Sequence, residues 1–238
     1  DHDLSGHPTI LNRKIANGTR NFLNEPAMSQ QQMLQALNTG GELAESCHTK
    51  GCNVLCLGEM GIGNTSPSSV WMSLWGNLPL SSCVGSGSGL NTEGEKHKLA
   101  ILEQAVSNFK HQPLTHNAPS TIIQYFGGFE MVAAIGAMLR AAELRMIVLV
   151  DGFIMSACML AASKLYPAVL DYAVFGHCGD ESGHRQLLAL MQAQPILQLG
   201  MRLGEGTGAL CAYPIIESSV RMINEMNNFK DANIDKYF

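Results

Sequence analysis

A glutamate between two glycines is the residue of this chain best placed for acid–base chemistry. The segment Leu203-Gly204-Glu205-Gly206-Thr207-Gly208 precedes an apolar run, residues 209–223, that predicts a helix. Small neighbours allow a ligand to approach the Glu205 carboxylate closely, and the helix start behind it offers unpaired N–H groups and a positive dipole end. These features suit a general base or an anion site. The alternative interpretation is a glycine-rich helix start that Glu205 caps.

A second glutamate lies in a glycine-rich turn, Gly58-Glu59-Met60-Gly61-Ile62-Gly63-Asn64-Thr65, after a short apolar run at 53–57. Glycines between a strand and a helix let backbone N–H groups converge on an anion. The spacing is neither G-x-G-x-x-G nor a Walker loop, because no Lys-Ser/Thr follows Gly63. The turn predicts a phosphate or sugar site with Glu59, Gly61, Gly63 and Asn64. A tight strand-to-helix turn is the alternative.

Another glycine-rich loop, Val84-Gly85-Ser86-Gly87-Ser88-Gly89, stands before a helix that carries Lys98. Free backbone N–H groups and a lysine inside the helix indicate a phosphate clamp formed by Gly87, Gly89 and Lys98. A flexible linker followed by a solvated basic helix face remains the alternative.

Two further strand ends carry polar residues. Val150-Asp151-Gly152-Phe153 ends a buried strand with an acid, which indicates contact of Asp151 and Gly152 with a sugar hydroxyl; the alternative is a helix cap at Asp151. Residues 175–185 gather two histidines, two acids and an arginine, which favours a substrate-orienting loop over a polar turn. The seven-residue separation of His177 and His184 is poor for a metal, so we expect none.

Composition narrows the class of protein. The 238 residues are 46% hydrophobic with a net charge of −5, which argues against a nucleic-acid face. No apolar run reaches the roughly 18 residues that cross a membrane. The 7 cysteines are dispersed without a Cys-x-x-Cys motif, which favours reduced thiols and a cytoplasmic location. The sequence of residues 1–12 is typical of the interior of a loop, so we expect the chain to be a fragment.

The chain alternates strand and helix patterns, which predicts parallel βαβ units and an α/β fold. We expect helices at 29–48, 67–75, 94–110, 129–144, 156–165, 185–194 and 209–223, and strands at 53–57, 146–150 and 171–175. Ligands bind at the carboxyl ends of such strands. We expect a helical N-terminal segment at 1–50, a nucleotide-binding core at 51–208 and a C-terminal helical segment at 209–238.

The order of these segments resembles the nicotinate-nucleotide:dimethylbenzimidazole phosphoribosyltransferases, the enterobacterial members most closely. The resemblance also includes residues 13–22 and 25–28 and Gly127-Gly128-Phe129-Glu130, and it runs along nearly the whole chain. It implies a Rossmann-like three-layer fold, in which helices flank a parallel sheet, and a small helical lobe. The family's N-terminal part has no counterpart here, so we expect the sheet to be incomplete.

The resemblance implies transfer of the phosphoribosyl group from nicotinate mononucleotide to 5,6-dimethylbenzimidazole in cobalamin nucleotide-loop assembly. It makes Glu205 the catalytic base and Leu203 an apolar wall of the benzimidazole pocket. Glu59, Gly61, Gly63, Asn64, Gly87, Gly89, Lys98, Asp151 and Gly152 match nucleotide-binding segments. It implies a homodimer without cofactor, metal, nucleic-acid or membrane partner. Gly179 departs from the serine of the family pattern, so a hydroxyl contact there is not expected.

One base suffices for this chemistry. Nicotinate leaves from a cationic pyridinium and needs no acid, whereas the incoming benzimidazole must lose its N–H proton. The paired carboxylates of glycoside hydrolysis are therefore unnecessary. The alternatives are a non-catalytic protein that binds a nucleotide or sugar phosphate, and an inactive fragment.

Overall fold

The fold is described here from a computed structural model, which describes residues 6–7, 9–112, 118–202 and 204–227. Three short parallel strands, β1 (Val54–Leu57), β2 (Ile147–Val150) and β3 (Ala173–Phe175), form one sheet in the order β1-β2-β3. Val54 pairs with Ile147 in the first ladder, and Val148 pairs with Ala173 in the second. The sheet confirms the α/β class and the parallel βαβ arrangement.

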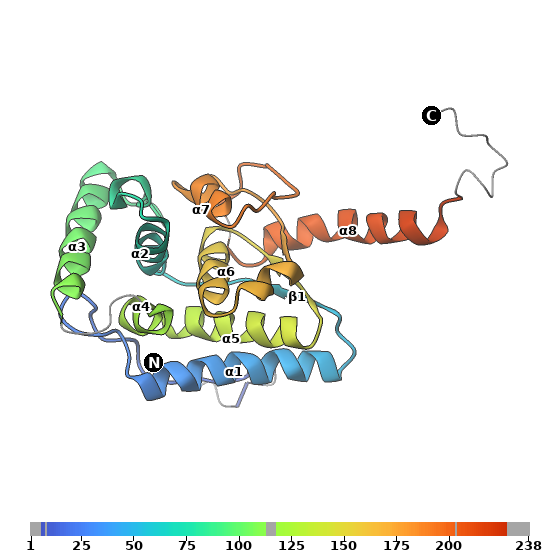
Figure 1. Ribbon diagram of the computed structural model, residues 1–238, viewed down its shortest axis with the longest axis horizontal. Coiled ribbons are helices and arrows are strands. Elements are labelled where there is room, and N and C mark those ends of the chain that lie inside the picture. The colour runs from blue at the N-terminus through green and yellow to red at the C-terminus, as the bar shows by residue number, and fades with distance from the viewer. Residues whose placement is uncertain (1–5, 8, 113–117, 203, 228–238) are drawn as a thin grey trace.

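Helices precede, connect and follow the three strands, and Figure 1 shows their arrangement. They are α1 (Gln30–Thr49), α2 (Thr65–Gly76), α3 (Thr92–Lys110), α4 (Pro119–Phe126), α5 (Phe129–Glu143), α6 (Phe153–Leu165), α7 (His184–Leu190) and α8 (Thr207–Glu225), with short 3₁₀ helices η1 (Leu80–Ser82) and η2 (Pro167–Tyr172).

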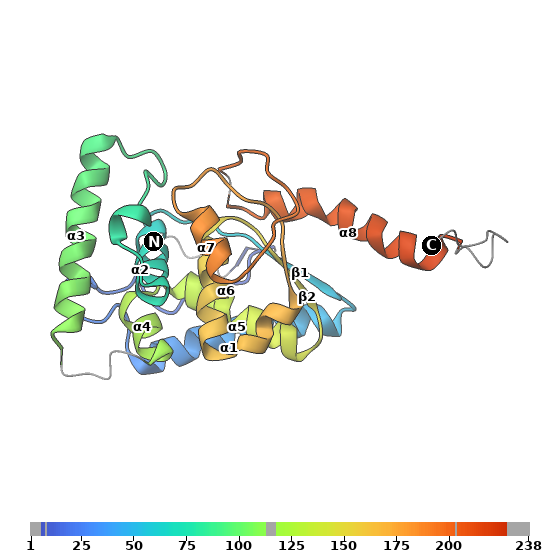
Figure 2. The same cartoon turned by 45° about the horizontal axis from the view of Figure 1, so that its top comes forward.

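The strand order explains where the helices pack. Each connection moves one strand in the same direction, so right-handed crossovers put α5 and α6 on the same face of the sheet. The two helices do pack against each other and against β2. Helix α1 lies along α5 in Figures 1 and 2, and the contact is close because both helices carry glycine there: a Cβ on Gly40 would overlap the Ala133 carbonyl, and one on Gly136 the Leu37 carbonyl.

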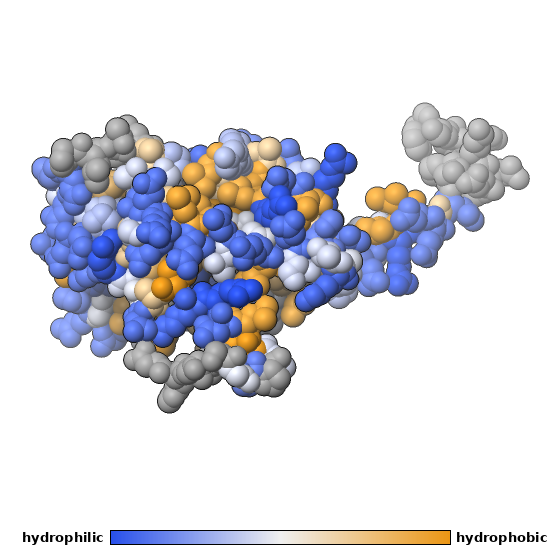
Figure 3. Space-filling view, turned by 90° about the horizontal axis from the view of Figure 1, so that it is seen from below, coloured by the Kyte–Doolittle hydropathy of each residue, from blue (hydrophilic) through white to orange (hydrophobic). Residues whose placement is uncertain are grey.

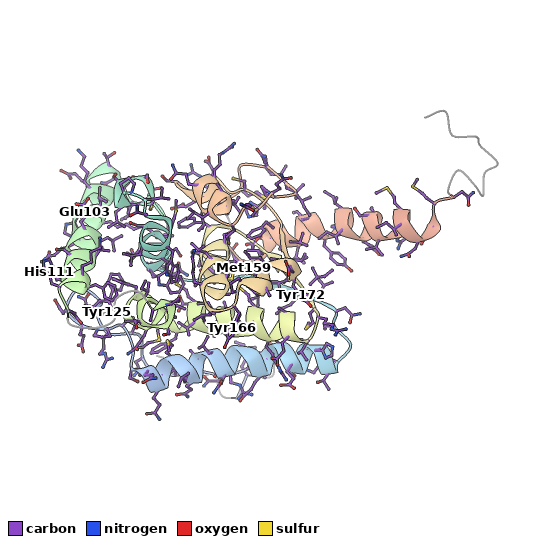
Figure 4. The ribbon with its side chains drawn as sticks, in the orientation of Figure 1. Glu103, His111, Tyr125, Met159, Tyr166 and Tyr172 are labelled. Carbon is purple, nitrogen blue, oxygen red and sulfur yellow. The ribbon has the colours of Figure 1, made fainter. Side chains whose placement is uncertain are left out.

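An aromatic cluster joins α3 to α4. The ring of Phe109 lies 4.8 Å from that of Tyr125 and 5.1 Å from that of Phe126. Figure 4 shows Tyr125 beside the lower end of α3. The Tyr125 hydroxyl accepts a 2.8 Å hydrogen bond from the Gln112 side chain, so the buried ring keeps a polar partner. This cluster fixes α3, which carries Lys98, relative to the rest of the core.

Some helix and strand boundaries agree with those predicted from the sequence, and others differ by several residues. Ser29 caps α1 in a capping box with Gln32, so the helix begins within one residue of the predicted start at 29. The predicted strand 171–175 is wrong in its first part, because η2 continues to Tyr172. The predicted helix 185–194 ends early at Leu190, and α4 and both 3₁₀ helices were not expected.

Helix α8 starts against β1 and then extends away from the rest of the molecule (Figures 1 and 2). Orange hydrophobic residues are visible on its outer part in Figure 3, and the exposed apolar side chains of α8 include Ile215, Val220 and Ile223. No described helix is long and apolar enough to span a bilayer. The predicted division at 1–50, 51–208 and 209–238 stays a prediction.

Candidate active site

The carboxyl ends of β1 and β2 hold the predicted acidic residues together. Glu59 is the second residue after β1, Asp151 follows β2 directly, and the segment that carries Glu205 crosses both ends. Helix α8 also contacts β1. The strand-end rule predicts that Glu59 and Asp151 share one edge of the sheet, and the structure adds the Glu205 segment to them.

The turn after β1 is closed by its own glutamate. The Glu59 carboxylate oxygen Oε2 accepts hydrogen bonds from the Asn64 side chain at 2.6 Å and from the Gly61 N–H at 2.9 Å. The predicted convergence of backbone N–H groups on an anion is thus partly met by the protein's own carboxylate. Asn64 is buried and precedes α2, so the turn is tied to the start of that helix.

Burial raises the pKa of Glu59, while the hydrogen bonds from Asn64 and Gly61 oppose that increase. The nearby negative charges of Glu130 and Glu205 raise the pKa further. Glu59 and Glu205 therefore interact electrostatically across the strand end. A cluster of carboxylates of this kind attracts a developing positive charge in a ligand.

The segment around Glu205 lies so close to the end of β1 that Gly58 has no room for a side chain. A Cβ on Gly58 would overlap the backbone of Glu205 and Gly206, and a Cβ on Gly204 would overlap the Glu59 carboxylate. The Glu59 N–H donates a 2.6 Å hydrogen bond to the Gly204 carbonyl. Glu205 itself is exposed. Leu203, the predicted wall of the benzimidazole pocket, lies outside the described residues.

Asp151 is fully buried, and its two carboxylate oxygens have backbone partners. Oδ2 accepts a 3.1 Å hydrogen bond from the Gly206 N–H, and Oδ1 accepts one of 2.9 Å from the Ala209 N–H. The start of α8 is thus occupied by a carboxylate of the protein itself. Gly152, the N-cap of α6, is also buried. Direct contact of Asp151 and Gly152 with a nucleotide stays a prediction.

A second cluster surrounds the Gly-Ser loop. The Lys98 ammonium donates hydrogen bonds to the Thr65 hydroxyl at 2.8 Å and to the Gly85 carbonyl at 3.1 Å. The Gly87 N–H donates to the Glu181 carboxylate at 3.2 Å. Burial lowers the pKa of Lys98, and the charges of Glu181 and Glu95 oppose that decrease. The loop is therefore attached to α2, α3 and the loop after β3.

Gly87 and Gly89 both take left-handed backbone conformations, with φ of +54° and +114°. Residues other than glycine rarely adopt these backbone φ values. The loop can therefore turn sharply above Lys98, as a phosphate clamp requires. Gly63 in the first turn is also left-handed, with φ of +96°, whereas Gly61 faces the Asn64 side chain.

The two histidines of the loop after β3, His177 and His184, are buried and contact other parts of the protein. His184 accepts a 2.9 Å hydrogen bond from the Gly179 N–H at Nδ1, and its Nε2 lies 3.1 Å from the Ser156 hydroxyl. His177 packs against the start of α8. Burial, and then the neighbouring His177, lower the pKa of His184 to about 4. Within the described part of the chain, no group of three or more His, Cys, Asp or Glu side chains could hold a metal.

Two residues of the clusters were missed as site candidates in the sequence. Thr65 binds Lys98, and Glu181 binds the Gly-Ser loop. Thr65 directly follows the glycine-rich turn, and Glu181 lies in the polar loop after β3, so both stood in recognised segments. Their partners are distant in sequence, and no local pattern specifies such pairing.

A groove of about 900 Å³ lies elsewhere, between α1, α5 and η2. Its lining includes Leu34, Leu139 and Tyr166 and none of the predicted site residues. Figure 4 shows Tyr166 and Tyr172 on this side of the molecule, beside α5. The residues that the sequence predicts for catalysis and nucleotide binding therefore do not line this groove.

Comparison with known proteins agrees with this geometry. The sequence model of the family described as "Phosphoribosyltransferase" matches residues 1–234. Proteins named nicotinate-nucleotide–dimethylbenzimidazole phosphoribosyltransferase from Bacteroides fragilis and Phocaeicola vulgatus are each 56% identical, over all of this chain and 68% of the relative. The crystal structure of CobT from Thermus thermophilus has a TM-score of 0.91 at 33% identity, and the match covers 99% of this chain and 69% of that one. The chain belongs to this phosphoribosyltransferase family.

Proposed function

We propose that the chain moves the phosphoribosyl group of nicotinate mononucleotide to a nitrogen of 5,6-dimethylbenzimidazole. The products are α-ribazole 5′-phosphate and nicotinate, and the step belongs to assembly of the cobalamin nucleotide loop. Relatives named for this reaction match the full chain. One observation carries the proposal: the Glu205 segment is held across the strand end beside Glu59, where a base can face a bound nucleotide.

Glu205 acts as the general base. It takes the N–H proton of the benzimidazole as the other ring nitrogen forms the bond to the ribose anomeric carbon. The bond to the pyridinium nitrogen breaks at the same centre, and its electron pair leaves with the pyridine nitrogen, which becomes neutral. Attack from the opposite face converts the β-nucleotide into an α-product. The flanking glycines leave the carboxylate of Glu205 accessible to the flat base.

Glu59 stabilises the reacting ribose. Positive charge grows on the ribose ring as the pyridinium leaves, and a partly buried carboxylate at the strand end stabilises such charge. The hydrogen bonds from Asn64 and Gly61 fix the Glu59 carboxylate, so little reorganisation is needed during reaction. Gly63 lets the turn approach the sugar closely.

Lys98, Gly87 and Gly89 bind the 5′-phosphate. A lysine ammonium carries three donors, and two of them have protein acceptors, the Thr65 hydroxyl and the Gly85 carbonyl. The remaining donor is available for a phosphate oxygen. The partly buried ammonium also interacts more strongly with an anion than a solvated one would.

The assembly and location are part of the same proposal. We infer a homodimer in the cytoplasm that uses small-molecule substrates, without a cofactor or nucleic acid. The net charge of −5 argues against nucleic acid as a partner, and the dispersed cysteines favour the cytoplasm. The dimer follows from the resemblance to the family. Sedimentation measured across a range of concentrations would test the dimer, and a single species of monomer mass would contradict it.

The decisive experiment incubates the chain with nicotinate mononucleotide and 5,6-dimethylbenzimidazole and measures nicotinate and α-ribazole phosphate together. We expect equal amounts of both products, and no nicotinate when the benzimidazole is omitted. Nucleotide binding without either product would support the alternative of a non-catalytic binding protein. Nicotinate release without benzimidazole would indicate a hydrolase and contradict the proposal.

A further inference from the structure

The Glu205 segment is attached to the sheet on both sides of the glutamate. On the N-terminal side, the Gly204 carbonyl accepts the 2.6 Å hydrogen bond from Glu59 at the end of β1. On the C-terminal side, the Gly206 N–H donates the 3.1 Å hydrogen bond to Asp151 at the end of β2. Glu205 is thus the single residue between two anchored peptides. Its position depends directly on both anchors.

The second anchor is stronger than one hydrogen bond suggests. Asp151 is 0% exposed and also accepts the 2.9 Å hydrogen bond from the Ala209 N–H, so it holds the first turn of α8 at two points. A carboxylate is favoured at a helix N-terminus, where N–H groups lack partners inside the helix. A buried carboxylate that accepts two N–H bonds from one segment leaves that segment little freedom.

His177 completes the anchor from the end of β3. It is 1% exposed, and its Nε2 lies 3.6 Å from the Asp151 Oδ1. Its ring fills the space beside Gly208, because a Cβ there would overlap the imidazole. The start of α8 therefore contacts both the Asp151 carboxylate and the His177 ring.

We propose that Asp151 is a positioning residue that fixes the Glu205 carboxylate through the backbone of Gly206 and Ala209. This inference rests on the proposed function, because it gives Glu205 the role of base. It replaces direct contact between Asp151 and the substrate by an indirect role. A base that moves by about 1 Å can lose roughly 100-fold in rate, so the anchor affects the chemical step more than nucleotide binding.

Asp151→Asn tests the proposal with little change in size. The amide can accept one of the two N–H bonds, but its NH₂ group faces the other N–H as a second donor. We expect kcat to fall by roughly 10- to 100-fold, with the KM for nicotinate mononucleotide changed by less than about threefold. Asp171→Asn is the matched control, since Asp171 is exposed on η2, and it should retain the wild-type kcat.

A double-mutant comparison separates positioning from general damage. If Asp151 acts only through Glu205, adding Asp151→Asn to Glu205→Gln should change the residual rate by less than about twofold. A purely structural role would lower the residual rate by the same factor as in the wild type. A multiplicative loss, or a wild-type kcat in folded Asp151→Asn, would overturn the proposal.

Two further measurements keep the test decisive. Should Asp151→Asn fail to fold, Gly208→Ala displaces the same helix start from the His177 side, and a wild-type kcat in that variant would overturn the proposal. Amide exchange of Gly206 and Ala209 should accelerate in Asp151→Asn even without substrate. If wild-type chain forms no product, the proposed function fails, and unchanged exchange at these two amides would separately reject the anchor.

Discussion

The ammonium of Lys98 donates a 2.8 Å hydrogen bond to the hydroxyl of Thr65, 33 residues earlier in the chain. Thr65 is the first residue of α2 and Lys98 lies within α3. A glycine-rich loop precedes each of these helices, so the bond holds the two loops next to each other. Two loops that each resemble an ordinary turn in sequence become parts of one candidate phosphate site. The bond also orients the lysine before any ligand arrives.

Replacement of Lys98 by methionine should weaken nucleotide binding. The variant keeps the apolar stem and loses a charge-assisted hydrogen bond, so the Kd for nicotinate mononucleotide should rise by roughly 10- to 100-fold. Calorimetric titration measures this change. Lys110→Met, at the exposed far end of the same helix, serves as control and should bind normally. An unchanged Kd in Lys98→Met would remove Lys98 from the phosphate site.

Replacement of Glu205 by glutamine should stop turnover while the nucleotide still binds. The amide has a similar shape but cannot accept the benzimidazole proton, and loss of a general base costs roughly 10²- to 10⁴-fold in kcat. Single-turnover nicotinate release and titration with nicotinate mononucleotide measure the two effects separately. Glu217→Gln, on the exposed side of α8 beside Arg221, is the control. A Glu205→Gln enzyme with normal turnover would refute the base assignment.

Much of the fold follows from local sequence. The Ser29–Gln32 capping box begins α1, and short apolar runs before glycine-bearing turns give β1 and β2. The alternation of these signals predicts a parallel sheet, because parallel strands need helical crossovers. Helix α4 escaped prediction since it has only 8 residues, too few to show a clear helical period. Its helical state depends on the aromatic cluster that it joins.

The candidate site was predictable in part for the same reason. The strand-end rule brings Glu59 and Asp151 to one edge, since each follows a parallel strand. Only the fold shows that the Glu205 segment crosses both strand ends. The direction of each side chain was not predictable. Asp151 could face a ligand or the start of α8 with an identical local sequence, and only the fold shows which N–H groups it accepts from.

The α1–α5 contact offers a matched test of packing. A Cβ on Gly40 would overlap the Ala133 backbone, whereas the nearest atom to a Cβ on Gly41 is 3.6 Å away, an ordinary contact. Gly40→Ala should therefore lower the free energy of unfolding by roughly 1–3 kcal/mol. Gly41→Ala should keep or raise it, because alanine favours the helix by up to about 1 kcal/mol. Urea unfolding of both variants measures the difference, and equal stability would contradict the close contact.

The buried His184 predicts how stability depends on pH. Its Nδ1 accepts the Gly179 N–H, so the folded protein holds a neutral ring, and protonation would place two donors face to face. The pKa of this ring is about 4 in the folded chain, against the ordinary histidine value of 6.5 in the unfolded chain. Between these values the unfolded chain binds a proton that the folded chain does not, so stability decreases as pH falls from 6.5 to 4. The loss amounts to about 3 kcal/mol by pH 4.

Comparison of variants isolates this contribution. Free energies of unfolding in urea should be measured at several pH values between about 4 and 7 for the wild type, for His184→Gln and for His111→Gln. His111 is exposed at the end of α3 (Figure 4). The His184→Gln chain lacks the titrating ring, so it should be less stable at about pH 7 and should lose about 3 kcal/mol less than the wild type on acidification. His111→Gln should follow the wild-type curve. Parallel curves for wild type and His184→Gln would show that the folded chain accommodates a charged ring at this position.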